Sequence, residues 1–164
     1  MQHVQTRSTT SALVLTAVLI ALATLFTMYT KIPVPGIRGY FNVGDVVIMT
    51  SALLLGRKYG AYIGAIGPAL ADLFLGYAVF VPITFVVKGI EGYLVGTVYN
   101  NKTTISALVA TIVGGIIIVA GYLSLILCIR SRRSHCCIVT NTIQAIMSVI
   151  ISMILYAILR KRLG

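Results

Sequence analysis

The chain is 164 residues long, and 59% of its residues are hydrophobic while only 10% are charged. A soluble domain of this size has too small an interior to bury that much apolar surface, so the composition excludes an ordinary soluble protein. The predicted fold class is an all-α, polytopic membrane protein that forms a single domain over residues 1–164.

The formal net charge of +10 raises the question of nucleic acid binding. The basic residues, however, lie at the ends of long apolar runs, as the positive-inside rule describes for membrane proteins. The three cysteines fall in one short segment and match no disulfide or zinc framework, so no metal site is expected. We therefore expect a lipid bilayer as the environment and no nucleic acid partner.

Residues 1–9 form a polar tail, and the first apolar run predicts a membrane-spanning helix over residues 10–29. Ala17 and Ala21 form a small-xxx-small pair on this helix, which permits the close approach of another helix. The spacing alone leaves two interpretations open. The pair packs inside the protein, or it docks a partner subunit.

Residues 30–41 form the connection that follows. Pro33 and Pro35 favour extended backbone, and the glycines of this segment permit bends. An arginine and two aromatic residues, Tyr40 and Phe41, complete a mixture that favours a lid over the mouth of a cavity. The alternative is a plain solvated connection.

A short helix is predicted over residues 43–55, with Asn42 as its N-cap and Asp45 in its first turn, where a carboxylate suits the helix dipole. After a tight basic turn, a third helix is predicted over residues 61–77. Asp72 lies near the end of that helix. It either pairs with a buried basic residue or contacts a ligand.

The fourth predicted helix, over residues 82–99, carries charges at membrane depth. Thr84, Lys88 and Glu91 are spaced i, i+4 and i+7, so they share one face of the helix. A bare charge at that depth costs roughly 3 kcal/mol on insertion scales, so such residues face a protein interior. We expect the three side chains to project into a ligand-sized cavity. A purely structural ion pair between Lys88 and Glu91 is the alternative.

Two further helices are predicted over residues 105–127 and 139–159. Residues 123–138 are anomalous, because they bring three arginines, a histidine and all three cysteines to one connection. A shifted reading frame that is restored near Val139 would produce such a patch. Resequencing of the source DNA tests that hypothesis.

Six helices place both termini on the same side of the membrane. With the anomalous segment left aside, seven basic residues fall on that side and two on the other, so the positive-inside rule predicts cytoplasmic termini. The connection at residues 30–41 is then an extracellular lid loop over the outer end of the predicted cavity. The seven are Arg7, Arg57, Lys58, Lys102, Arg160, Lys161 and Arg162, and the two are Lys31 and Arg38.

Three stretches, in order, carry a resemblance to a known family: GYFNVGDVVI at residues 39–48, GPALADLFLGY at 67–77 and PITFVVKGIEGYLVG at 82–96. With them, the chain resembles the substrate-binding S components of energy-coupling factor (ECF) vitamin transporters, above all the hydroxymethylpyrimidine/pyridoxine and riboflavin types. The resemblance covers about residues 12–122 and resumes at 141–152. It implies an ECF S-component-like bundle of six transmembrane helices in the bacterial plasma membrane.

The resemblance also implies a vitamin site near the outer face, and a complex with a transmembrane coupling protein and two ATP-binding subunits. ATP and Mg would bind to those partner subunits, and no cofactor is expected in this chain. Ala17 and Ala21 match the family's docking surface for the coupling protein. The positions that match the family's ligand residues are Tyr40, Phe41, Asn42, Thr84, Lys88, Glu91, Asn141 and Gln144.

The sequence contains no Gly-x-x-x-x-Gly-Lys-Ser/Thr loop and offers no good general base within its spans, so we expect a transport subunit and not an enzyme. The predicted function is high-affinity capture of a small water-soluble vitamin or precursor, hydroxymethylpyrimidine or pyridoxine, for ATP-driven import. The alternatives are a riboflavin-binding S component and a stand-alone secondary transporter or channel.

Overall fold

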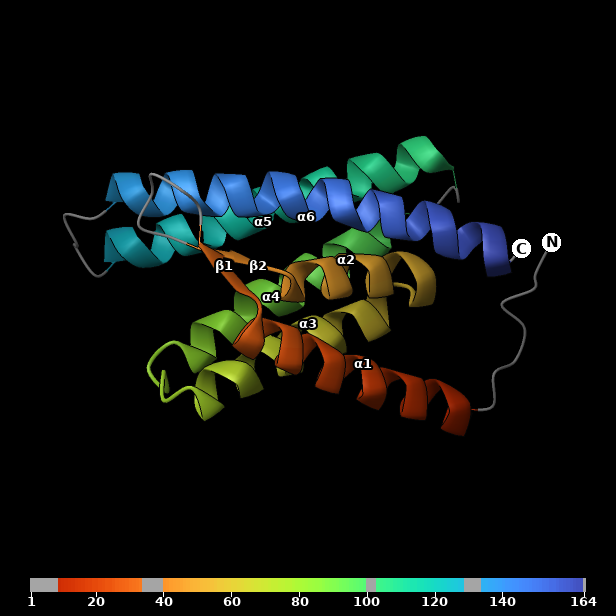
Figure 1. Ribbon diagram of the computed structural model, residues 1–164, viewed down its shortest axis with the longest axis horizontal. Coiled ribbons are helices and arrows are strands. Elements are labelled where there is room, and N and C mark those ends of the chain that lie inside the picture. Colours follow the sequence, from red (N-terminus) through yellow and green to blue (C-terminus); the bar gives the residue numbers. More distant parts are fainter. Residues whose placement is uncertain (1–8, 34–39, 100–102, 129–133, 164) are drawn as a thin grey trace.

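The computed structural model describes residues 9–33, 40–99, 103–128 and 134–163. Within these ranges the chain forms six α-helices, which run side by side, and two short strands (Figure 1). The elements in chain order are α1 (Thr9–Tyr29), β1 (Lys31–Pro33), β2 (Tyr40–Asn42), α2 (Gly44–Leu55), α3 (Arg57–Phe74), α4 (Val81–Val98), α5 (Thr104–Cys128) and α6 (Ser134–Leu163).

All six predicted helices are present. The largest differences lie at the start of α3, which begins at Arg57, and at both ends of α6, which runs from Ser134 to Leu163. The expected basic turn between α2 and α3 is in fact a single glycine, Gly56, with φ 88°. Only glycine adopts such a φ without strain, so one residue ends α2 and starts α3.

The connection at residues 30–41 has more regular structure than expected. Its two ends pair as antiparallel strands, with Lys31 opposite Asn42, Ile32 opposite Phe41 and Pro33 opposite Tyr40. The central residues, 34–39, and the middle of the anomalous segment, 129–133, lie outside the described residues. The lid function and the frameshift hypothesis therefore stay predictions.

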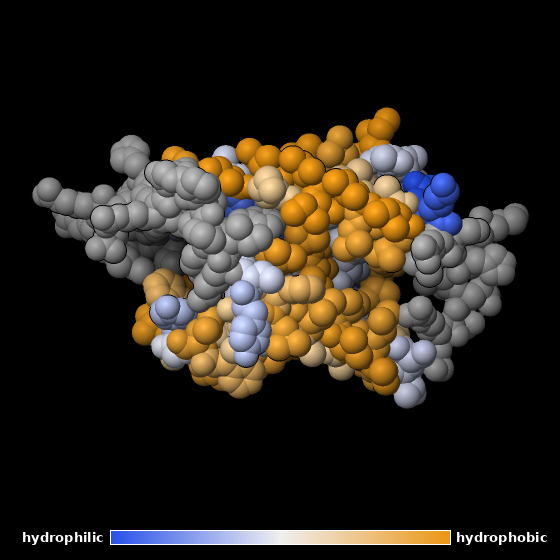
Figure 2. Space-filling view, in the orientation of Figure 1, coloured by the Kyte–Doolittle hydropathy of each residue, from blue (hydrophilic) through white to orange (hydrophobic). Residues whose placement is uncertain are grey.

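Four helices are long and apolar enough to cross a membrane: α1, α4, α5 and α6. The other two differ, since α2 has 12 residues and α3 starts with Arg57 and Lys58. The start of α1 and the end of α6 lie at the same end of the bundle (Figure 1). Apolar side chains cover most of the described surface in the view of Figure 2. A multi-pass membrane protein follows, while six full spans and cytoplasmic termini stay predictions.

The short helix α2 lies at the centre of the bundle, in contact with α1, α3, α4 and α6. Ten of its 12 residues are buried, from Gly44 to Leu53. A helix that is apolar on every side belongs in a core, which explains why α2 need not reach across the bilayer. Its first turn delivers Asp45 to the interior, where that residue is only 1% exposed.

Glycines let α3 and α4 pack backbone against backbone. A Cβ atom on Gly92 would overlap the carbonyl oxygen of Gly60, and one on Gly64 would overlap the carbonyl oxygen of Lys88. Small residues at helix contacts allow such close approach, and within a bilayer this packing is a main source of helix association. The same contacts fix the backbone position of Lys88.

A Gly92→Ala substitution should destabilise the fold, because the new methyl group meets fixed backbone atoms of α3. Overpacking of this kind costs roughly 1–3 kcal/mol. The apparent melting temperature in detergent, followed by size-exclusion chromatography, measures it. Gly115→Ala is the control, since its Cβ meets the side chain of Ala145 at 3.2 Å. Equal melting temperatures for the two variants would contradict the backbone-contact argument.

Candidate functional site

Two of the three acidic residues of the chain contact one buried lysine, and the third lies beside its helix. The Lys88 ammonium donates to Asp45 Oδ1 at 2.6 Å and to Glu91 Oε2 at 3.0 Å. The third acid, Asp72, accepts a hydrogen bond at 2.6 Å from Thr84, which lies one helical turn before Lys88. In a chain with a net charge of +10, both fully buried carboxylates therefore hold the same lysine, and the half-buried Asp72 lies one helical turn away.

Helix α4 supplies one wall of the site. Its face carries Thr84, Lys88 and Glu91, which are 3%, 3% and 0% exposed. The expectation that these residues share a face directed into the protein is confirmed. Their role in binding a ligand is a separate matter and stays a prediction.

Helices α2 and α6 complete the cluster through Asp45. Its Oδ1 atom holds Lys88, and its Oδ2 atom accepts a hydrogen bond at 2.5 Å from the side-chain amide of Gln144. Asp45 thus links three helices, and our interpretation of it as a first-turn carboxylate that suits the helix dipole missed this role. One signal could have revealed the role of Asp45: it is one of only three acidic residues in the chain, and it lies in an apolar run.

Tyr122 of α5 is a second residue that the sequence analysis missed. The Lys88 ammonium lies 5.7 Å from the centroid of its ring, within the range of a cation–π interaction. Tyr122 is the one aromatic residue in the whole of α5, Thr104–Cys128. That isolation is the signal that could have drawn attention to it.

Two polar atoms beside this cluster have no hydrogen-bond partner within the part of the chain that the structure describes. They are Glu91 Oε1 and Ser148 Oγ, both on residues with 0% exposure. Ser148 follows Gln144 by one turn on α6, so the two share a face of that helix. Buried polar groups normally find partners, so these atoms mark positions where a further donor would be accommodated.

The structure gives fewer contacts for the other four residues of the predicted substrate-binding set. Asn42 accepts a hydrogen bond at 2.7 Å from the backbone N–H of Gly44, which agrees with its expected place at the start of α2. Asn141 is half-buried, three residues before Gln144 on α6. Tyr40 and Phe41 lie in β2, but their side chains fall outside the described residues.

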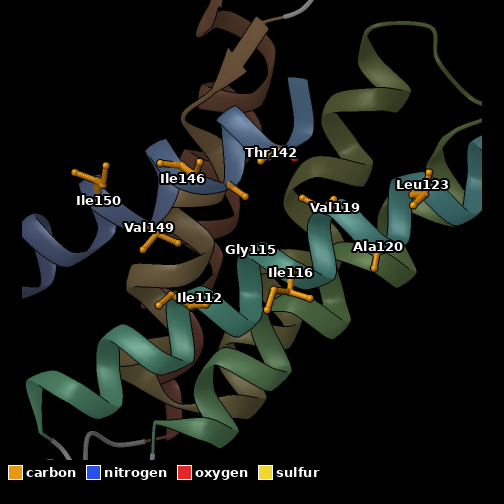
Figure 3. A pocket seen from close by; sticks show the side chains of 11 residues that line it. Ile112, Gly115, Ile116, Val119, Ala120, Leu123, Thr142, Ile146, Val149 and Ile150 are labelled. Atoms are coloured by element: carbon orange, nitrogen blue, oxygen red, sulfur yellow. The ribbon is translucent and has the colours of Figure 1, made fainter. Parts of the chain in front are cut away.

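A cavity of about 530 Å³ lies between α5 and α6 (Figure 3). It is apolar, and residues of its rim such as Ile112, Ile116 and Ile146 are 45–59% exposed on the outer surface. None of the charged residues around Lys88 lines it. This groove is therefore not the polar hollow that the sequence predicts beside Lys88 and Glu91, and that hollow stays a prediction.

The outer face of α1 leaves Ala17 and Ala21 exposed. Their neighbours Leu13, Val14 and Val18 are 58–61% exposed. The opposite face packs on α3, where Thr24 donates a hydrogen bond at 3.0 Å to the carbonyl of Gly67. Within the described residues, the small-xxx-small pair is thus left available on the surface.

The sequence matches the family described as "ECF-type riboflavin transporter, S component" over residues 7–161. The chain belongs to this family. As an ECF S component it is a substrate-binding membrane subunit of a vitamin or vitamin-precursor transporter, and not an enzyme. S components bind a small vitamin and work with a coupling protein and ATPase subunits.

Two relatives add to this assignment. A protein of Pyrococcus woesei described as "Uncharacterized protein in gap 3'region" is 38% identical over 143 residues, which are 86% of this chain and 96% of the relative. The "Thiamine precursor transporter HmpT" of Lactococcus lactis subsp. cremoris is 32% identical over 107 residues. That match covers 65% of this S component and 62% of the relative.

An Asp45→Asn substitution should destabilise this S component. It removes one carboxylate from the buried Lys88 ammonium and disturbs the contact with Gln144. Breaking a buried ion pair in this way costs about 3–5 kcal/mol. The loss is measured as a lower apparent melting temperature in detergent.

Thr50→Val is the matched control on the same helix. Thr50 is buried, and its hydroxyl has no hydrogen-bond partner among the described residues, so the nearly isosteric change should be close to neutral. If Asp45→Asn melts like Thr50→Val, Asp45 does not hold the helices together.

Proposed function

We propose that this S component captures hydroxymethylpyrimidine or pyridoxine outside the cell for ATP-driven import. The observation that carries the proposal is the buried polar cluster of Asp45, Lys88, Glu91 and Gln144, built from three helices inside an otherwise apolar bundle. Ionisable residues at membrane depth are costly, and they commonly mark substrate sites. The similarity to a thiamine precursor transporter supports the same substrate class.

The size of the polar set supports a compact ligand. One ammonium, a few carboxylates and a few carboxamides suit a small heteroaromatic ring with a few hydrogen bonds. In this proposal Tyr40 or Phe41 stacks on the ring, and Glu91 Oε1 accepts from an amino or hydroxyl group. Asn141 and Gln144 contribute from α6, Thr84 from α4, and Asn42 from the start of α2.

Riboflavin is the second candidate ligand, and the family description of the riboflavin transporter S component favours it. A flavin would need a longer pocket than a single ring. A stand-alone secondary transporter or channel is the other alternative. It would drive uptake with an ion gradient, and it would not co-purify with ATPase subunits.

For energy we propose a complex with the transmembrane coupling protein and two ATP-binding subunits, which would hold ATP and Mg. The exposed pair Ala17 and Ala21 on α1 is the proposed docking surface for the coupling protein. Small residues there would let a partner helix approach closely. We also propose that both termini are cytoplasmic, that the lid over residues 30–41 faces outward, and that the membrane is a bacterial plasma membrane.

The purified full chain should release a small heteroaromatic molecule on denaturation, identified by mass spectrometry. After that molecule is removed, titration calorimetry should show tight binding of hydroxymethylpyrimidine or pyridoxine. Lys88→Ala and Glu91→Ala should each abolish tight binding while the protein still inserts into the membrane. Recovery of lipid alone, with no binding of any vitamin in the titration, would contradict the proposed function.

Ala17→Leu and Ala21→Leu should prevent co-purification with the coupling protein and ATPase subunits, and should reduce uptake by whole cells. Ligand binding by the isolated chain should be unchanged, because both alanines lie on the outer surface. Ala157→Leu, at an exposed alanine on α6, is the control and should leave the complex intact. Loss of the complex in the control as well would show that any added bulk on the surface is disruptive.

A further inference from the structure

We propose that the site selects its ligand by charge: it takes the free, unphosphorylated form, neutral or cationic, and rejects the phosphate ester of the same molecule. The inference rests on the proposed function and names the ligand class of that same site. It is carried by the excess of carboxylates over ammonium groups among the described residues around Lys88. It is also carried by the two buried polar atoms left without partners there.

The charge balance of the site is opposite to that of the whole protein. Asp45 and Glu91 both accept hydrogen bonds from the single ammonium of Lys88, and Asp72 accepts one from Thr84, one helical turn away, while the chain as a whole carries a net charge of +10. The overall charge would suggest anionic ligands. In a buried site, however, the nearest charges dominate the interaction, and among the described residues two carboxylates contact the one ammonium group.

Lys88 has little capacity left for an anion. Its ammonium already donates to Asp45 at 2.6 Å and to Glu91 at 3.0 Å, and the ring of Tyr122 covers it at 5.7 Å. A lysine ammonium has three donor hydrogens in all, so two are in use. A phosphate group would have to displace a carboxylate from Lys88 and leave that carboxylate buried without its partner.

The atoms without partners indicate what the ligand must bring. Glu91 Oε1 is fully buried, and its oxygen can accept a hydrogen bond from a donor. Ser148 Oγ, equally buried, lies one turn beyond Gln144, whose amide already contacts Asp45. A ligand N–H or O–H would donate the missing hydrogen bond to Glu91 Oε1. A phosphate monoester carries a charge of about −1.5 to −2 near pH 7, so it brings mainly acceptors.

The test uses the full chain in lipid nanodiscs and matched pairs of ligands in titration calorimetry. The pairs are hydroxymethylpyrimidine and its phosphate ester, pyridoxine and pyridoxine 5'-phosphate, and riboflavin and its 5'-phosphate. We expect one unphosphorylated molecule to bind and its ester to bind at least about 100-fold more weakly, a difference that like-charge repulsion in a buried site readily supplies.

The outcomes separate the two proposals. Binding of an ester within about threefold of its parent alcohol overturns the charge selection alone. Absence of binding by all six molecules overturns the proposed function and, with it, this inference.

Variants test whether the carboxylates cause the selection. Glu91→Gln keeps the shape of the side chain and removes its charge, so the preference for the parent over the ester should fall by about tenfold or more. Asp72→Asn removes the charge of the carboxylate that accepts a hydrogen bond from Thr84. It should also lower the preference for the parent over the ester. Thr50→Val should leave the preference unchanged. An unaltered preference in both charge-removing variants overturns the inference.

Discussion

The buried ammonium of Lys88 is the constraint on which the rest of the structure depends. A lone ammonium at membrane depth would be costly, so the fold must bring carboxylates to it. One comes from the same helix, as Glu91, and the other comes from Asp45 at the start of α2. The need for Asp45 explains why the short helix α2, with ten of its 12 residues buried, lies at the centre of the bundle.

Besides its apolar core, two kinds of contact hold the bundle together. Helices α3 and α4 meet through glycines, with Gly64 against the carbonyl of Lys88 and Gly92 against that of Gly60. Helices α2 and α6 meet through hydrogen bonds, from Gln144 to Asp45 and from Ser152 to the carbonyl of Val46 at 3.5 Å. The first kind depends on an unbroken surface of small residues, whereas the second depends on polar groups that can exchange partners.

The helices and the face of α4 could be predicted from sequence, because both depend on local periodicity. Thr84, Lys88 and Glu91 lie on one helix, so their spacing alone fixes their common direction. The links from Asp45 to Lys88 and Gln144 join residues 43 and 99 positions apart, and no local pattern encodes them. The paired strands β1 and β2 were also missed, since each has only three residues and includes or adjoins prolines and glycines.

The polar contacts between α2, α4 and α6 give the site its means of discrimination. Every donor that a ligand brings must match an acceptor such as Glu91 Oε1, and every acceptor it brings competes with Asp45 for Gln144 or Lys88. Away from water, a mismatched ligand leaves one of these polar groups without a hydrogen bond. Its binding is then weakened by the full desolvation penalty of that group. A correct ligand exchanges one set of partners for another. Specificity then arises from the cost of a wrong match more than from the strength of any single new bond.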